Sequence, residues 1–378
     1  MNPALLVQAA DRWGTPLYVT DLGRAAANLA AYRAALPNAL LAYAVKANSD
    51  PQLLRRLVAD GAGVEVVNET ELALATRAGC PPDRIVMNGV GRTDAELRHA
   101  LEAGVLVNAE SLDDLEATLG MAPSGARIGL RLNPGLDAQT HPHLATGAAS
   151  SKFGIGWDDL PDVLARMGAA DRRLASVGAH IGSDLADAAI YAELLERLRA
   201  ARQRTGAEWI DIGGGLRSIE ALPAIATDER VIVEPGRAIV ADAGWLVTRV
   251  VRTQPRADRT YAVADAGMTE LLRPMLYGAE HRVGLLTPGH ALEAHRVDLA
   301  GPVCEAGDVL ATDIGRWMDT SRAGVGALLV IERAGAYGAS MASTYNGRLR
   351  PAEAVIENGD VRLSRRRETL EDLVSRDA

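Results

Sequence analysis

Cysteine and long apolar stretches are scarce in this sequence, and each scarcity excludes a class of protein. Two cysteines, Cys80 and Cys304, cannot build a disulfide framework, so we expect a reducing, cytoplasmic environment. They are also too few for a zinc site, and no metal site is predicted. No apolar run is long enough to span a bilayer, and the first residues lack the pattern of a signal peptide. No membrane contact is therefore expected.

Positive charge is also in short supply. The 378 residues include 40 lysines and arginines against 49 aspartates and glutamates, which gives a net charge of −9. Such a chain repels the phosphates of nucleic acids, so nucleic acid is not an expected partner. The length and the 48% hydrophobic content suit a globular protein with one large domain and one smaller domain.

Lysine is the rarest of the charged residues, with Lys46 and Lys152 as its two occurrences. A lysine amine can lose its proton and condense with an aldehyde to a Schiff base, which a guanidinium cannot do. Lys46 ends the apolar run 40–45, which is typical of a buried strand. Its position alone leaves two interpretations open: a reactive amine at a strand end, or a cation that merely reaches solvent.

Short apolar runs alternate with amphipathic stretches through the first two thirds of the chain. Such alternation predicts a parallel sheet, and eight units predict a closed (β/α)8 TIM barrel. An open doubly wound sheet is less favoured because no G-x-G-x-x-G follows the first run. The predicted strands are 40–45, 64–67, 85–88, 105–108, 128–132, 177–181, 209–212 and 231–233.

The pattern changes after about residue 245. Short β runs joined by irregular loops predict a second, mainly antiparallel β domain. The segment 16–19 is expected to add a strand to it, and 369–375 to form a short helix. The predicted bounds are 20–245 for the barrel and 1–19 with 246–378 for the β domain. Its predicted strands are 245–251, 261–264, 300–303, 309–311, 326–331 and 354–356.

Polar residues follow most of the predicted barrel strands, where the chemistry of such barrels gathers. Asparagine and glycine favour turns, which explains the asparagines well but explains Lys46, His180 and Glu234 poorly. The residues at these strand ends are Lys46, Asn48, Asn68, Asn88, Asn108, Asn133, His180, Ser183, Gly213-Gly214-Gly215 and Glu234-Pro235-Gly236-Arg237.

Four of these features, a lysine, a phosphate cradle, an acid and a histidine, together predict a pyridoxal phosphate site. The glycines after the seventh strand let backbone N–H groups converge on an anion such as phosphate. In the turn after the eighth strand, Arg237 suits a phosphate or carboxylate and Glu234 suits a protonated ring nitrogen. Lys46 and His180 would lie at the same end of the barrel as the glycines, Glu234 and Arg237. Each feature alone has a simpler explanation, and their joint placement favours the coenzyme.

Longer motifs run from one end of the chain to the other. They are Tyr43-Ala44-Val45-Lys46-Ala47-Asn48, His141-Pro142-His143, Ser151-Lys152-Phe153-Gly154-Ile155, His180-Ile181-Gly182-Ser183, Asp211-Ile212-Gly213-Gly214-Gly215-Leu216, Glu234-Pro235-Gly236-Arg237, Asp265-Ala266-Gly267-Met268, Arg273-Pro274, Leu276-Tyr277, Gly301-Pro302-Val303-Cys304-Glu305, Gly335-Ala336-Tyr337-Gly338-Ala339-Ser340-Met341 and Arg348-Leu349-Arg350-Pro351-Ala352-Glu353. On these motifs the chain resembles the diaminopimelate decarboxylase family, whose fold is an alanine racemase-like barrel with a β domain (fold type III of the pyridoxal phosphate enzymes).

The resemblance implies a role for each matching residue. Lys46 would carry pyridoxal phosphate, His180 would stack on its ring, and Glu234 would pair with its ring nitrogen. Cys304 would donate a proton, reaching the barrel mouth from the partner subunit of a homodimer. Gly214, Gly215 and Arg237 would surround the phosphate, and Ser183 and Gly236 would also bind the cofactor. The substrate contacts would be Arg237, Arg273, Tyr277, Glu305 and Tyr337, with Tyr337 also on the cofactor.

The implied reaction is the decarboxylation of meso-2,6-diaminopimelate to L-lysine and CO2, the final step of lysine biosynthesis. Glu234 favours decarboxylation because it keeps the ring nitrogen protonated, whereas a racemase of this fold carries arginine there. One alternative is a sister decarboxylase for carboxynorspermidine, ornithine or arginine. Arg273 and Glu305 favour diaminopimelate, whose far end is itself an amino acid. The other alternative is a non-catalytic binding protein, against which the presence of both Lys46 and Cys304 argues.

Overall fold

The structure, a computed structural model, describes residues 2–136, 150–183, 185, 187–217 and 219–377. The motif His141-Pro142-His143 lies outside the described residues. The chain divides into two compact units, residues 26–239 and residues 1–25 with 240–378. The bounds of 20–245 and of 1–19 with 246–378 remain a prediction.

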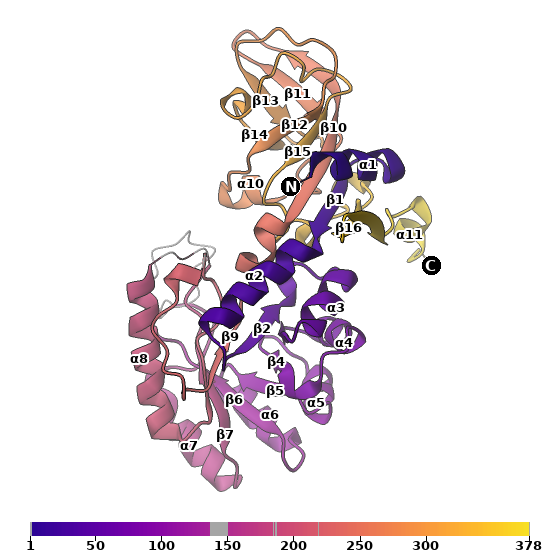
Figure 1. Ribbon diagram of the computed structural model, residues 1–378. Helices are drawn as coiled ribbons and strands as arrows, with labels where there is room; N and C mark the ends of the chain where they lie inside the picture. Colours follow the sequence, from indigo (N-terminus) through magenta and orange to yellow (C-terminus); the bar gives the residue numbers. More distant parts are fainter. Residues whose placement is uncertain (1, 137–149, 184, 186, 218, 378) are drawn as a thin grey trace. The chain divides into compact units, whose positions relative to one another are not determined.

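Residues 26–239 contain a closed barrel of parallel strands, which confirms the predicted (β/α)8 architecture (Figure 1). The first strand pairs with the last through Leu40–Ile232 and Leu41–Val233, which closes the ring. The barrel strands are β2 (Leu40–Ala44), β3 (Gly63–Val66), β4 (Ile85–Met87), β5 (Leu106–Ala109), β6 (Arg127–Arg131), β7 (Leu174–Gly178), β8 (Trp209–Asp211) and β9 (Val231–Val233).

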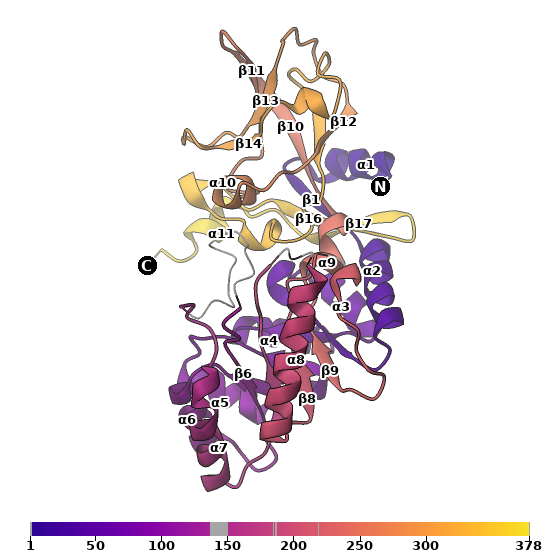
Figure 2. The same cartoon turned by 90° about the vertical axis from the view of Figure 1, so that its left-hand side faces the viewer.

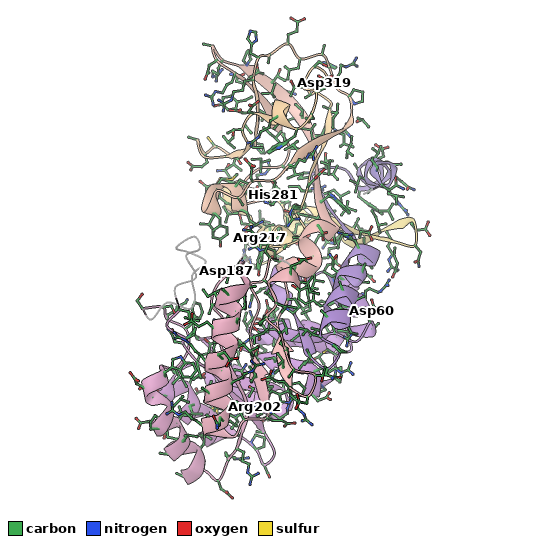
Figure 3. The ribbon with its side chains drawn as sticks, turned by 60° about the vertical axis from the view of Figure 1, so that its left-hand side comes forward. Asp60, Asp187, Arg202, Arg217, His281 and Asp319 are labelled. Atoms are coloured by element: carbon green, nitrogen blue, oxygen red, sulfur yellow. The ribbon has the colours of Figure 1, made fainter. Side chains whose placement is uncertain are left out.

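Local capping signals start the helices that cover the barrel. The Asp50 side chain accepts from the backbone of Gln52 and Leu53, and Thr93 forms a capping box with Glu96. In Figure 3, Asp187 lies at the start of α8, where its carboxylate accepts from Ala189 N. These helices are α3 (Pro51–Ala59), α4 (Glu69–Arg77), α5 (Asp94–Glu102), α6 (Leu112–Met121), α7 (Leu160–Ala169) and α8 (Ala188–Thr205), seen outside the strands in Figure 2.

Two barrel-unit features differ from the sequence-based expectation. The sixth barrel strand, β7, ends at Gly178 rather than at 181, and Ala179 N makes the last hydrogen bond of its ladder, to Asp211 O. His180 therefore lies in the loop after the strand. The helices α2 (Leu22–Ala35) and α7 were not predicted; α2 is rich in alanine, which gives high helix propensity without a clear apolar stripe.

The second unit is built on a nine-stranded, mainly antiparallel sheet, as predicted. Two parallel pairs interrupt it, β1 with β16 and β11 with β13. The segment 16–19 contributes β1, and Thr369 caps the short helix α11 (Leu370–Val374). The strands are β1 (Leu17–Asp21), β10 (Gly244–Pro255), β11 (Thr260–Ala264), β12 (Val283–Thr287), β13 (Val297–Ala300), β14 (Val309–Ala311), β15 (Leu328–Ile331), β16 (Ala352–Glu357) and β17 (Asp360–Arg365).

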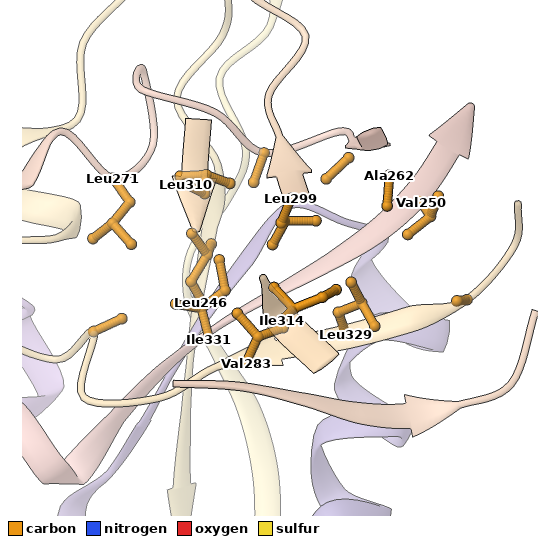
Figure 4. Packing of buried hydrophobic residues seen from close by; sticks show 14 of the residues in the cluster. Leu246, Val250, Ala262, Leu271, Val283, Leu299, Leu310, Ile314, Leu329 and Ile331 are labelled. Carbon is orange, nitrogen blue, oxygen red and sulfur yellow. The ribbon is translucent and has the colours of Figure 1, made fainter. Parts of the chain in front are cut away.

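One apolar cluster packs against strands of this sheet (Figure 4). Leu246, Leu299 and Leu329 come from three different strands and are fully buried in it. Burying a leucine side chain contributes about 2 kcal/mol, so this cluster holds the irregular loops around it in place. The predicted strand 300–303 is wrong, since β13 ends at Ala300 and residues 301–308 form a turn. The strands β12 and β17 were not predicted.

Candidate active site

Charged and amide side chains meet inside the barrel at the carboxyl ends of its strands. Because all eight strands are parallel, residues at their ends converge whatever their separation in sequence. Most of these side chains are buried, so their mutual contacts decide their charge states. A small internal cavity is lined by Asn88, Asn108, Arg131, Gly178, Ala179, His180, Asp211, Gly213 and Glu234.

Lys46 is held at this end of the barrel by a buried carboxylate. It lies in a single 3-10 turn, Val45–Ala47, directly after β2. Its Nζ is 3.0 Å from Glu65 Oε1 and 2.9 Å from Oε2, and the Glu65 side chain is 1% exposed. An acid buried on β3 can stay charged only beside a cation. The amine therefore has a fixed carboxylate partner, while 37% of the Lys46 side chain remains exposed.

Glu234 and Asp211 form a second buried acidic pair. Glu234 follows β9, and its Oε1 accepts a hydrogen bond of 2.6 Å from Asn88 Nδ2. Burial, and then the charges of Asp211 and Glu65, raise the pKa of Glu234 well above its usual value. Burial likewise raises the pKa of Asp211, although the Gly213 N–H opposes the shift. The pair therefore holds a proton when no further positive charge is present.

This charge pattern fits the ring of pyridoxal phosphate. Three buried carboxylates, Glu65, Asp211 and Glu234, compete for the cations that lie nearest to them. A protonated ring nitrogen beside Glu234 would add the positive charge that the cluster lacks and would take the place of the bound proton. The donor set of the barrel therefore suits a cationic heterocycle.

His180 lies beside the cluster with a neutral ring. Burial, and then the positive charges of Arg131 and Lys46, lower the pKa of His180 well below its usual value. A charged imidazolium would repel a protonated heterocycle, whereas a neutral imidazole can stack on one. The environment of His180 therefore suits the stacking role that the resemblance implies.

The glycine loop after β8 packs directly against neighbouring backbone. A Cβ on Gly214 would collide with Glu234 O, and a Cβ on Gly215 would collide with Gly182 O. Gly215 also has a φ of +86°, which a side chain would strain. Any other residue would push the loop away from the strand ends, so glycine is needed to bring these backbone groups to the site.

A hydroxyl and a guanidinium lie together near this loop. Arg237 Nη2 donates to Ser183 Oγ over 2.9 Å. Gly236 packs against the β2 end, where a Cβ would come within 3.0 Å of Ala47 Cβ. Guanidinium, hydroxyl and glycine N–H groups are the usual ligands of phosphate. The residues predicted to bind the cofactor here thus form a donor set that fits its phosphate.

The other predicted residues belong to the β unit. Arg273 and Tyr277 lie on α10 (Arg273–Tyr277), and Arg273 is buried with its Nη1 3.5 Å from His281 Nε2. Cys304 and Glu305 are exposed on the turn between β13 and β14. Tyr337 has a φ of +55° in the turn that follows β15. These residues are presented on short turns and one helix rather than on strands.

Several residues of the barrel cluster were missed or misjudged from the sequence. Glu65 and Asp211 were given no role, although a glutamate inside the apolar stretch 63–67 is a signal of a buried ion pair. Asn88 and Asn108 were explained as turn formers. Instead their amides hydrogen-bond to each other inside the barrel. Asn68 does have a local structural role, because its side chain caps the N-terminus of α4.

Comparisons with known proteins agree with this geometry. A family model described as the pyridoxal binding domain of pyridoxal-dependent decarboxylases matches residues 22–241. The diaminopimelate decarboxylase of Deinococcus radiodurans is 41% identical, with 97% of each chain covered. That of Pseudomonas aeruginosa is 40% identical, covering 97% of this chain and 94% of the relative. The chain belongs to the diaminopimelate decarboxylase family.

Solved structures of this family share the whole fold. The diaminopimelate decarboxylase of Helicobacter pylori, complexed with L-lysine, has a TM-score of 0.88 at 32% identity and covers 98% of both chains. The enzyme of M. jannaschii, also with L-lysine, has a TM-score of 0.88 at 29% identity and covers 99% of this chain and 94% of its own. The protein is accordingly a carboxy-lyase that depends on pyridoxal phosphate and acts on a small amino acid.

Two further findings concern only the part of the chain that the structure describes. No helix there is both long and apolar enough to cross a membrane. No group of three or more histidine, cysteine, aspartate or glutamate side chains there is arranged to hold a metal ion.

Proposed function

We propose that this chain removes one carboxyl group from meso-2,6-diaminopimelate to give L-lysine and CO2, the final step of lysine biosynthesis, in the cytoplasm. The observation that carries the proposal is the buried cluster that joins Lys46, Glu65, Asn88 and Glu234 inside the barrel. Full-length similarity to enzymes named diaminopimelate decarboxylase supports the choice of substrate.

The barrel residues would hold the coenzyme and set its charge. Pyridoxal phosphate, when bound, supplies an electron sink for the electron pair that the departing carboxylate leaves behind. Lys46 would hold the aldehyde carbon, and Glu234 would keep a proton on the ring nitrogen. His180 would cover one face of the ring and exclude water. The phosphate would lie among Ser183, Gly214, Gly215, Gly236 and Arg237, the donor set described above.

The β unit would supply substrate recognition and the proton. Diaminopimelate carries an amino-acid group at both ends, so its far end needs a cation for the carboxylate and an acid for the amine. Arg273 and Glu305 are residues of those types, with Tyr277, Tyr337 and Arg237 as further contacts. Cys304 Sγ–H would then protonate the carbon that has lost CO2. In the proposed homodimer, Cys304 comes from the partner subunit.

A substrate panel tests the reaction. The holoenzyme is supplied in turn with meso-diaminopimelate, carboxynorspermidine, ornithine and arginine, and CO2 release is measured. We expect release with meso-diaminopimelate at a rate at least a hundredfold above the others, because a site built for a charged amino-acid end leaves buried groups unpaired with substrates that lack one. Faster release with another compound would favour the sister decarboxylases, and no release with any would favour the binding protein.

Subunit mixing tests the shared site. Lys46→Ala and Cys304→Ala remove residues that would come from different subunits of one site. If the two inactive variants are unfolded together and refolded, about half of the dimers are mixed, and each mixed dimer has one intact site. Recovery of roughly a quarter of the wild-type activity is expected on that statistical basis. Recovery near zero, with dimers seen by sedimentation, would place both residues in the same subunit's site.

A further inference from the structure

A chain of amide and hydroxyl groups crosses the barrel behind Glu234. Ser176 Oγ on β7 donates to Asn108 Oδ1 on β5 over 2.8 Å. Asn108 Nδ2 donates to Asn88 Oδ1 after β4 over 2.9 Å. Asn88 Nδ2 then donates to Glu234 Oε1 over 2.6 Å and to Glu65 Oε1 over 3.2 Å. All five residues are buried, with exposed fractions of 6% or less.

The direction of this chain follows from charge. A reversed Asn88 amide would turn its carbonyl oxygen toward the Glu65 carboxylate, which is paired with Lys46 and has no proton to donate, and this is repulsive. Its NH2 group therefore faces the two carboxylates, and its oxygen must accept from Asn108. The Asn108 oxygen is then left to accept from the Ser176 hydroxyl. Each member fixes the next, so Ser176 and Asn108 determine where the Asn88 donors point.

The neighbouring strand leaves room for this chain. Gly129 on β6 lies beside both Ser176 and Asn108, and a Cβ at Gly129 would collide with Ser176 Oγ and Asn108 Oδ1. Its backbone does not have a positive φ, so the turn chemistry of glycine does not explain this position. Glycine here preserves the hydrogen bond between the two side chains.

We propose that Asn88, aimed by Asn108 and Ser176, is a positioning residue that links the carboxylate partner of Lys46 to the acid that faces the coenzyme ring. Its two N–H groups would bind one oxygen of each carboxylate. This would fix the rotation of the Glu234 carboxyl and separate two like charges by a donor. The inference rests on the proposed function, because it assigns Asn88 a task only if the barrel binds pyridoxal phosphate.

Coenzyme affinity tests the link without reference to turnover. Pyridoxal phosphate is removed from the holoenzyme with hydroxylamine and added back, and binding is followed by visible absorbance between pH 6 and 9. Asn88→Ala removes a hydrogen-bond donor to a charged group, so it should weaken coenzyme binding by roughly 10- to 100-fold. It should also shift the pH dependence of the absorbance band. Ser176→Ala should weaken it by about threefold to tenfold in the same direction, since Asn108 loses its orientation.

A matched variant separates positioning from general packing. Thr118 is fully buried in α6 and its hydroxyl donates to Asp114 O, outside the cluster. Thr118→Val should leave the coenzyme affinity within about twofold of wild type. The activity of Asn88→Ala should fall in kcat with little change in KM, because the residue would orient the coenzyme rather than bind substrate.

The outcomes distinguish this inference from the proposed function. If the wild type takes up no coenzyme, the proposed function fails. If the wild type binds but Asn88→Ala binds equally well with an unchanged pH profile, the positioning role is overturned. Equal losses in Asn88→Ala and Thr118→Val would also overturn it, as a general packing effect. If Asn88→Ala does not fold, the Ser176→Ala variant tests the positioning role instead. An unaltered coenzyme affinity in that variant contradicts the role.

Discussion

The barrel and the β unit present their candidate catalytic residues in opposite ways. In the barrel, Glu65 and Glu234 are buried and touch other charged or amide groups, so their charge states depend on their neighbours. In the β unit, Cys304 and Glu305 are exposed on a turn and are placed by backbone geometry. Reactivity is therefore set by electrostatics in one unit and by position in the other.

Asp308 shows how the β unit fixes that turn. Its carboxylate is buried and accepts 2.8 Å from Val303 N and 2.6 Å from Met268 N. Side chains at Gly267 or Gly301 would collide with it. The carboxylate thus ties the Cys304 turn to the loop that leads into α10 and Arg273. Burial raises the pKa of Asp308, and the two backbone N–H groups oppose the shift.

The largest expected effect comes from removing the amine of the barrel cluster. Lys46→Ala should lower turnover by about three orders of magnitude or more, because no other amine lies at that position. After borohydride reduction and digestion, mass spectrometry should find the pyridoxyl group on the Lys46 peptide. Lys152→Ala, which removes the other lysine, should keep both activity and adduct. An adduct at Lys152 would contradict the assignment.

Removing the exposed thiol of the β unit should be the next largest effect. Cys304→Ala should lower kcat by about 10²- to 10⁴-fold through loss of a general acid, while the coenzyme absorbance stays unchanged. Cys80→Ala is the control, since Cys80 is buried in the turn after α4 and burial raises the pKa of its thiol to about 11. Turnover that survives in Cys304→Ala would mean that another group donates the proton.

The anchor of the turn should have a smaller effect. Asp308→Asn keeps the size of the side chain but replaces one acceptor by a donor that faces a backbone N–H. We expect a loss of about 1–3 kcal/mol in unfolding free energy and a fall of roughly tenfold in kcat. Asp298→Asn is the matched control, because Asp298 is equally buried in this unit but binds Asp313 N and two arginines. It should destabilise the protein and leave kcat unchanged; equal kcat losses would refute positioning by Asp308.

The smallest effect concerns the pH dependence of the barrel. Burial, and then the charge of Glu65, raise the pKa of Glu71 to about 7. The folded protein therefore binds this proton more tightly than the unfolded chain, and stability falls as pH rises from about 4.5 to 7. Glu71→Gln should gain about 1–2 kcal/mol in unfolding free energy at pH 8 and nothing at pH 4, measured by urea denaturation.

Glu96, a partly exposed glutamate, should change stability with pH in the opposite direction and serves as the control. Hydrogen bonds from the backbone and hydroxyl of Thr93 lower the pKa of Glu96 in the α5 capping box. The charged Glu96 side chain contributes to folding stability at pH values above its usual pKa, and this contribution is lost as pH falls. Glu96→Gln should therefore lower the unfolding free energy at pH 8. The same sign in both variants would show that burial does not govern Glu71.

The elements that the sequence predicted best are those whose signal is local. The strands β9 and β14 begin and end as predicted, because each is a short apolar run between turn residues. The strand predicted at 300–303 failed because of a side-chain contact, which an apolar run does not reveal. Val303 N donates to the Asp308 carboxylate instead of to a neighbouring strand.

What the sequence determined by itself is the barrel, the lysine at its rim and the glycines after its seventh strand. These features depend on periodicity and on residue type, which can be read from residues that are close together in the sequence. The partners were decided by the tertiary structure. Asn88 and Glu234 are 146 residues apart, and Lys46, just after β2, is 19 residues from Glu65 on β3. The first contact exists only once β2 pairs with β9 and the ring closes, and the second needs β2 beside β3, because chain separation carries no information about which strand ends meet.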